Sequence, residues 1–110
     1  MKQIKLNVYE DSIMFDRHYY HEYGMKMPDR GETIEIHFAF SPDWDSYTKK
    51  VAGFWDRNRE ECRAQVISED NTCVVPAKAL EDFIFYVEVL GKRGDIIRHT
   101  ERRAIVFSGR

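Results

Sequence analysis

The side chains best suited to chemistry in this chain of 110 residues are its four histidines and two cysteines. His18 and His21 lie three residues apart in a tyrosine-rich segment, close to Asp16 and Glu22. A zinc site needs three or four ligands held in a firm geometry. Two histidines at this spacing in an expected loop, with no cysteine beside them, do not supply such a set. We therefore expect a polar loop that packs tyrosines on a sheet edge, and no metal.

The two cysteines could form a disulfide, but the expected strand register argues against it. If the turn lies within residues 69–71, Cys73 faces Val66 or Ser68, and Cys62 lies beyond the paired region. Free cysteines in alternating strands commonly pack as small hydrophobic side chains. We expect both thiols to be buried and unbridged.

Sequence signatures of catalysis are missing. The chain has no nucleophile elbow, no glycine-rich phosphate loop and no HExxH metal motif. No pair of acidic residues has a convincing shared pocket. The charged run from Arg57 to Arg63 and the basic group around Arg102 are most simply solvated turns. We expect no enzyme activity, no catalytic residue and no bound cofactor.

Aromatic side chains in the connections could form a binding surface. Exposed tryptophan and tyrosine stack on sugars in carbohydrate-binding modules, and exposed aromatic residues also mark protein interfaces. Trp55 is different, because it lies on an expected strand and should anchor the core. The candidate interaction surface therefore consists of residues in the expected loops, namely Tyr19, Tyr20, Tyr23, Trp44 and Tyr47.

Composition limits the class of protein further. One domain, residues 1–110, is expected from this length. The net charge of −2, from 19 acidic and 17 basic residues, does not favour nucleic acid as a partner. The N-terminal residues lack the apolar run of a secretory signal, and no apolar stretch approaches membrane-spanning length. We expect synthesis in the cytoplasm, reduced cysteines and no membrane partner.

The elements that position these residues are expected to be strands organised around residues 72–91. Pro76 cannot donate to a strand ladder, so it should end a short strand, and Gly91 should form the turn after the next one. From Phe83 to Leu90, side chains alternate with a period of two, which is typical of a strand with one fully buried face. That face should hold Phe83, Phe85, Val87 and Val89.

Further alternating runs are separated by turn residues at spacings of about 8–12 residues, with no convincing long helix. Residues 62–68 and 72–75 are expected to pair as a hairpin, and residues 16–31 to form a long loop. The pattern predicts an all-β fold, an antiparallel immunoglobulin-like β-sandwich of about 7–9 short strands. A closed barrel is the alternative. The expected core comprises Ile4, Leu6, Ile36, Phe38, Phe54 or Trp55, Val66, Val74, Leu80, Phe83, Phe85, Val87, Val89 and Ile105.

Part of the chain also resembles a known family. The run Phe54–Gly91, followed by Thr100 and the closing AIVFSG, resembles the immunoglobulin-like module at the N-terminus of phage baseplate upper proteins. Related tail-fibre proteins of Gram-positive phages and prophages carry the same module. The matching features are an aromatic residue at Phe54 or Trp55, the polar turn into Cys73-Val74-Val75-Pro76, and then Leu80, Phe83 and Gly91.

The resemblance implies a non-enzymatic structural role. A module of this kind docks on other tail or baseplate proteins by protein–protein contact, or associates with copies of itself as a homo-oligomer. The expected location is the virion, after synthesis in the cytoplasm of the bacterial host. A functional alternative is a carbohydrate-binding module that uses the exposed Trp and Tyr of the loops.

Overall fold

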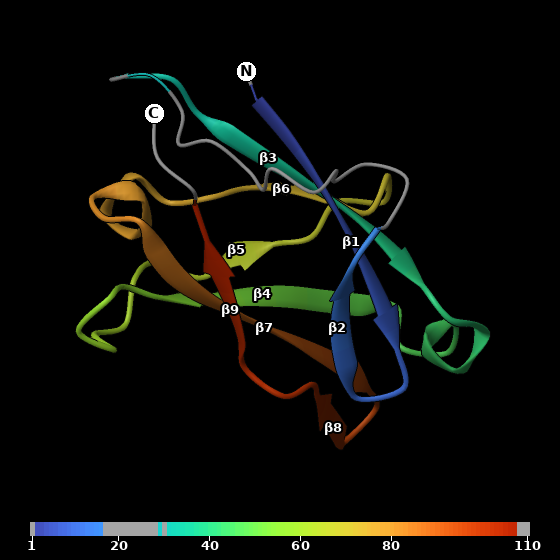
Figure 1. The fold of residues 1–110 in the computed structure, drawn as a ribbon. Helices are drawn as coiled ribbons and strands as arrows, with labels where there is room; N and C mark the ends of the chain where they lie inside the picture. The colour runs from blue at the N-terminus through green and yellow to red at the C-terminus, as the bar shows by residue number, and fades with distance from the viewer. Residues whose placement is uncertain (1, 17–28, 30, 108–110) are drawn as a thin grey trace.

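Two β-sheets pack on each other in the computed structural model, which describes residues 2–16, 29 and 31–107 (Figure 1). The first sheet has the strand order β2-β1-β3-β6, and the second has the order β5-β4-β7-β8, with β9 also paired to β7. The all-β sandwich predicted from the sequence is confirmed. The strands are β1 (Lys2–Tyr9), β2 (Ser12–Phe15), β3 (Ile34–Phe40), β4 (Lys49–Trp55), β5 (Gln65–Val66), β6 (Thr72–Val74), β7 (Ile84–Arg93), β8 (Ile96–His99) and β9 (Arg103–Val106).

Among the described strand pairs, one departs from the antiparallel pattern. β1 and β3 run parallel, with Ile4 opposite Ile36, whereas β1 and β2 form an antiparallel hairpin. β2 therefore ends, and β3 begins, at the same end of the sheet on either side of β1. Parallel neighbours need a long connection. Residues 16–33 supply its length, but most of the predicted loop 16–31 lies outside the described residues.

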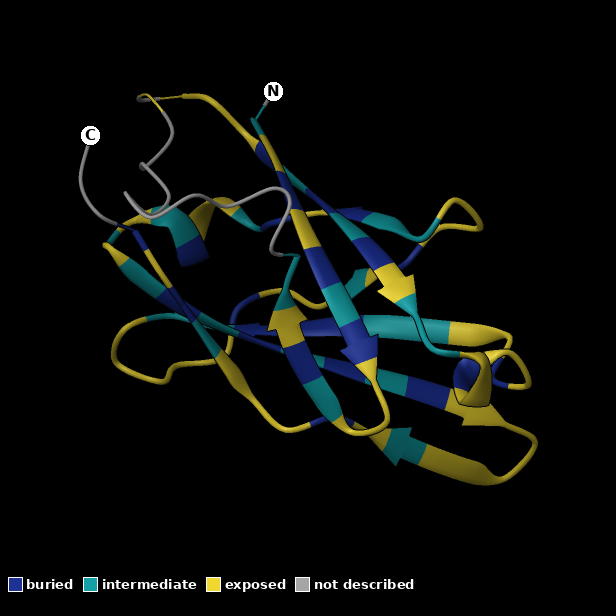
Figure 2. Cartoon of the chain, turned by 45° about the vertical axis from the view of Figure 1, so that its right-hand side comes forward, coloured by how far each residue is buried: buried dark blue, intermediate teal, exposed yellow. Residues whose placement is uncertain are grey.

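The core fills the space between the sheets. In Figure 2, buried residues alternate with more exposed ones along the strands, as a period of two requires. In β7, Phe85, Val87 and Val89 are fully buried, while Tyr86 and Glu88 on the opposite face are half-buried. The sequence analysis is confirmed for Ile4, Leu6, Ile36, Phe38, Phe54, Phe85, Val87, Val89 and Ile105, and Leu80 packs partly buried against them.

Three residues assigned to the core face solvent instead. Val66, Val74 and Phe83 are 77%, 38% and 51% exposed. Val66 pairs with Val51 on the outer side of the second sheet. In β6, Cys73 points inward and Val74 outward, and Phe83 precedes the first residue of β7. Trp55 is likewise not the core anchor, because Phe54 takes the inward position of β4.

The prediction that Gly91 forms a turn is wrong. β7 continues through Gly91 to Arg93, and the turn to β8 comes at Gly94, where φ is +58°. A positive φ suits glycine because it has no Cβ. Gly91 is instead a buried strand residue whose missing side chain leaves room for a neighbour.

The predicted hairpin between residues 62–68 and 72–75 is also wrong. β5 pairs with β4 in the second sheet, and β6 pairs with β3 in the first. The tight turn does exist, since Asn71 N–H donates to the Ser68 carbonyl at 2.9 Å. The chain uses it to cross from one sheet to the other. Local turn residues do not distinguish such a crossing from a hairpin.

Both cysteines are free and buried, as predicted. Burial raises the pKa of the Cys73 thiol to about 12, and burial also raises the pKa of Cys62. Both side chains therefore remain neutral thiols near pH 7 and act as apolar packing.

Replacing Phe85 with alanine should lower the free energy of unfolding by about 3–5 kcal/mol, because it removes a fully buried ring from the inner face of β7. Urea unfolding monitored by circular dichroism measures the change. Val106→Ala is the control, since Val106 is exposed on β9 and should change stability by less than about 1 kcal/mol. Equal unfolding midpoints for Phe85→Ala and the parent chain would contradict this facing of β7.

Candidate functional site

The aromatic surface predicted from the sequence does not exist at Trp44 and Tyr47. Trp44 is 0% exposed and Tyr47 is 9% exposed, so neither ring can present a face to a ligand. Trp44 ends the short 3-10 helix η1 (Pro42–Trp44), which turns its ring back into the core. The remaining candidates, Tyr19, Tyr20 and Tyr23, lie outside the described residues, as do His18 and His21.

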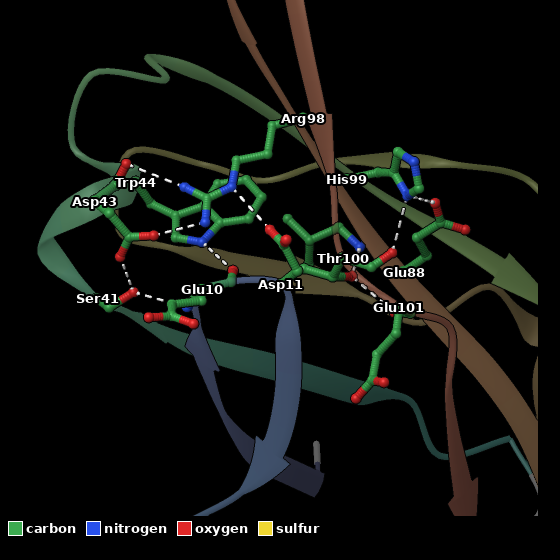
Figure 3. Close-up of polar contacts among 11 residues, drawn as sticks. Glu10, Asp11, Ser41, Asp43, Trp44, Glu88, Arg98, His99, Thr100 and Glu101 are labelled. Atoms are coloured by element: carbon green, nitrogen blue, oxygen red, sulfur yellow. Dashed lines mark hydrogen bonds and ion pairs between the residues drawn. The ribbon is translucent and has the colours of Figure 1, made fainter.

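Trp44 is held between two residues of the second sheet. A Cβ at Gly91 would lie 2.8 Å from Trp44 Cζ3, so only glycine leaves the ring this space. The Arg98 guanidinium lies 4.5 Å from the ring centroid. The indole Nε1–H donates to the Glu10 carbonyl at 2.7 Å, as Figure 3 shows. The ring therefore joins β7, β8 and the turn between β1 and β2.

Arg98 extends this contact with charge. Its Nε donates to Asp11 Oδ1 at 3.0 Å, and its Nη2 donates to Asp43 Oδ2 at 2.6 Å (Figure 3). The hydrogen bond from Ser41 and the one from Arg98 together hold the pKa of Asp43 below its ordinary value. The group contains a cation, two carboxylates and an indole, and each nitrogen of Arg98 and the indole N–H donates to a neighbour within it. Its arrangement suits joining the two sheets rather than catalysis.

A break between β8 and β9 adds a second link between the sheets. The two strands share one edge of β7, and residues 100–102 separate them. Thr100 is buried there. Its backbone N–H donates to Val89 O at 2.9 Å, and its hydroxyl accepts a hydrogen bond from Val89 N–H at 3.0 Å. Glu101 N–H then donates to the Asp11 carbonyl at 2.7 Å, across to the first sheet (Figure 3).

Trp55 repeats the arrangement on the outer face of the second sheet. A Cβ at Gly53 would lie 2.9 Å from Trp55 Cη2, and the Arg102 guanidinium lies 3.5 Å from the centre of the other ring face. Arg102 also pairs with Glu88, whose other oxygen is 3.3 Å from His99 Nδ1. Stacking on a sugar requires an uncovered ring face. Trp44 has none, and at Trp55 the Arg102 guanidinium occupies one face.

The outer face of the second sheet is the surface that sequence reasoning missed. Register places Val66, Val51 and Leu90 in one row across β5, β4 and β7. Ile97 on β8 is 65% exposed, and Val106 on β9 is 57% exposed. We define the apolar face by six residues, Val51, Val66, Ile84, Leu90, Ile97 and Val106.

The two outer faces of the sandwich differ in character. The centre of the first sheet carries polar rows, in which Gln3 pairs with Glu35 and Lys5 with His37. Its exposed apolar residues lie around these rows, at Tyr9, Met14 and Val74. The apolar face, by contrast, includes the central strands β4 and β7. The signal was present in the sequence, because the second side of the central alternation contains Ile84 and Leu90.

Other features of the described residues are less informative. An open groove of about 530 Å³ lies where the end of β6 approaches the segment before β5, and Cys62, Val74 and Pro76 contribute to its walls. Within residues 2–16, 29 and 31–107, no three His, Cys, Asp or Glu side chains are grouped as a metal site would require. In the same part of the chain, no helix has the length and apolar character needed to cross a membrane.

Comparison with known proteins gives no family. No family model matches the chain, and no curated protein matches its sequence.

Gly91→Ala should destabilise the chain by about 1–3 kcal/mol, because the new methyl group meets the buried Trp44 ring. Gly53→Ala is the matched comparison and should cost less, because Trp55 is half-exposed and can move outward. Chemical unfolding of both variants measures the two costs. A larger loss for Gly53→Ala would show that Trp44 is not tightly held.

The stability contributed by the Asp43 carboxylate should depend on pH. Its folded pKa is depressed, so this contribution is present above the unfolded pKa and is lost as pH falls through the folded value. The stability difference between the parent chain and Asp43→Asn should therefore stay level from pH 7 to about pH 5 and shrink below about pH 4. Urea midpoints across this range measure it. In an Arg98→Met background the acid-dependent part should be smaller, and curves that stay parallel down to pH 2 would contradict the assignment.

Proposed function

We propose that the chain is a non-enzymatic structural module of a phage or prophage tail, and that it binds other baseplate or tail proteins through the apolar face. On this proposal it is made in the bacterial cytoplasm and acts in the virion. The observation that carries the docking role is the apolar face itself. Large aliphatic side chains gathered on one face of a sheet, exposed on β5, β8 and β9 and half-buried on β4 and β7, are typical of a protein interface.

The rigidity of this face supports the proposal. β4 and β7 are hydrogen-bonded to each other over seven residue pairs, from Lys49–Lys92 to Trp55–Tyr86. Beneath them, Phe54 and Phe85 pack with their ring centroids 6.1 Å apart in the core. A surface held in this way loses little conformational freedom when it binds, which lowers the entropic cost of association.

The tail-module part of the proposal is supported by the sequence resemblance, and the sandwich architecture is consistent with it. β4, β5, β7 and β8 share one sheet, while β3 and β6 pair in the other. Two sheets packed face to face are also the architecture of an immunoglobulin-like sandwich. The parallel pairing of β1 with β3 is an addition to this pattern.

Carbohydrate binding is less well supported as an alternative. Trp44, one of the residues on which that hypothesis depended, is buried between Gly91 and Arg98, and the tyrosine-rich segment lies outside the described residues. The Arg102 guanidinium likewise covers one face of the Trp55 indole. No specific contact among the described residues favours a sugar ligand.

Ile97→Asp should abolish binding to tail proteins without unfolding the chain, because it places a charge on an exposed position of the apolar face. The experiment co-expresses the tagged chain with the tail and baseplate proteins encoded beside its gene, followed by affinity purification and quantitative gel analysis. Met14→Asp is the matched control, since Met14 is also exposed but belongs to the first sheet. Equal recovery of partners by both variants would contradict docking through the apolar face.

A further inference from the structure

We infer that the apolar face binds a second copy of this chain, in a two-fold dimer whose axis runs across the strands. The inference rests on the proposed docking function and names one partner for it. It follows from the charges at the two ends of the face and from the restrictions that symmetry places on them.

One end of the face is positively charged. Lys49 on β4 and Lys92 on β7 are directly opposite each other in the register, and both are exposed. Like charges in this position repel each other and destabilise the pair. No ion pair involves either lysine within the described part of the chain. An external carboxylate at this end would relieve the repulsion.

The other end of the same face carries a carboxylate, Glu61, as well as a cation, since the Arg59 guanidinium lies 5.9 Å from the ring centroid of Tyr86, the register partner of Trp55. Glu61 forms an isolated bridge with Trp55, the last residue of β4, which places it beside the outward-facing indole. Glu61 is exposed, and the described ion pairs do not include it. The face therefore carries unpaired charges of opposite sign at opposite ends of β4.

Symmetry decides which arrangement of two copies uses these charges. A two-fold dimer places the same surface of each copy against the other. An axis parallel to the strands would put the Lys49–Lys92 end of one copy against the same end of its partner. An axis perpendicular to the strands reverses β4, so each copy's Lys49 approaches the other copy's Glu61. Only the second arrangement brings each copy's Lys49 toward a carboxylate of the other copy.

The centre of the face can be buried in this arrangement. Val51 and Leu90 of each copy then lie against the middle of the partner's sheet, where Glu88 is located. The Glu88 side chain is only 15% exposed, Arg102 is its ion-pair partner, and His99 Nδ1 lies 3.3 Å from its other oxygen. Its burial therefore leaves no unpaired carboxylate, which is the main cost of placing an acid in an interface.

Charge exchange tests the inference in the full chain. Sedimentation velocity over a range of concentrations should show a monomer–dimer equilibrium for the parent chain. Lys49→Glu and Glu61→Lys should each weaken the dimer by at least about tenfold, because the axis makes every contact occur twice and the change replaces attraction with repulsion. The double variant Lys49→Glu/Glu61→Lys should recover most of the lost affinity.

Control variants separate this contact from a general effect of charge. Glu32→Lys makes the same charge change at an exposed acid just before β3 of the first sheet and should leave the dimer unchanged. Circular dichroism melts of all variants confirm that they fold. A double variant that remains as weak as the single ones would overturn the proposed arrangement.

The outcome also distinguishes this inference from the proposed function. A parent chain that remains monomeric at every concentration overturns the dimer. If Ile97→Asp still abolishes recovery of tail proteins in that case, the docking function stands with a different partner. If Ile97→Asp affects neither dimerisation nor recovery of tail proteins, the apolar face is not an interface, and both proposals fail.

Discussion

The structure depends on the space that Gly91 leaves for Trp44. A strand residue with any side chain would occupy the position of the indole, which lies between β7 and the guanidinium of Arg98. Because the ring fits there, η1 closes one end of the sandwich. The Trp44–Glu10 and Arg98–Asp11 hydrogen bonds then fix the first hairpin against the second sheet. Packing and polar contacts are coupled here. If the indole left its place beside Gly91, its hydrogen bond to the Glu10 carbonyl and its contact with Arg98 would both be lost.

The same combination of glycine, tryptophan and arginine appears twice with different consequences. At Trp44 it lies inside the molecule and joins two sheets. At Trp55 it lies on an outer face, where Gly53 lets the indole lie flat and Arg102 covers it. The flat ring avoids a protruding side chain, and Arg102 brings a cation to Glu88. A glycine in a strand can thus serve internal assembly in one place and the shape of a surface in another.

Alternation predicted the inward residues of the long strands well, because burial of Phe85, Val87 and Val89 follows directly from a period of two. It could not predict the fate of Trp44, since burial of a loop residue depends on a cavity formed by a distant glycine. The sequence also could not show that β5 and β6 belong to different sheets, because a turn such as 68–71 has the same local chemistry in a hairpin and in a crossing between sheets. None of the six residues of the apolar face was among those that the sequence analysis assigned to an interaction surface. The sequence analysis assigned only the buried side of the central strand, whereas register neighbours on β5, β8 and β9 make much of the other side apolar.

The shortness of β5 and β6 has a further consequence. These outermost strands on one flank of the sandwich contain two and three residues. An edge this brief offers too few free backbone groups to seed the lateral growth of a sheet from one molecule to the next. Crowded copies can therefore meet through side chains on their faces while that flank resists polymerisation into ribbons.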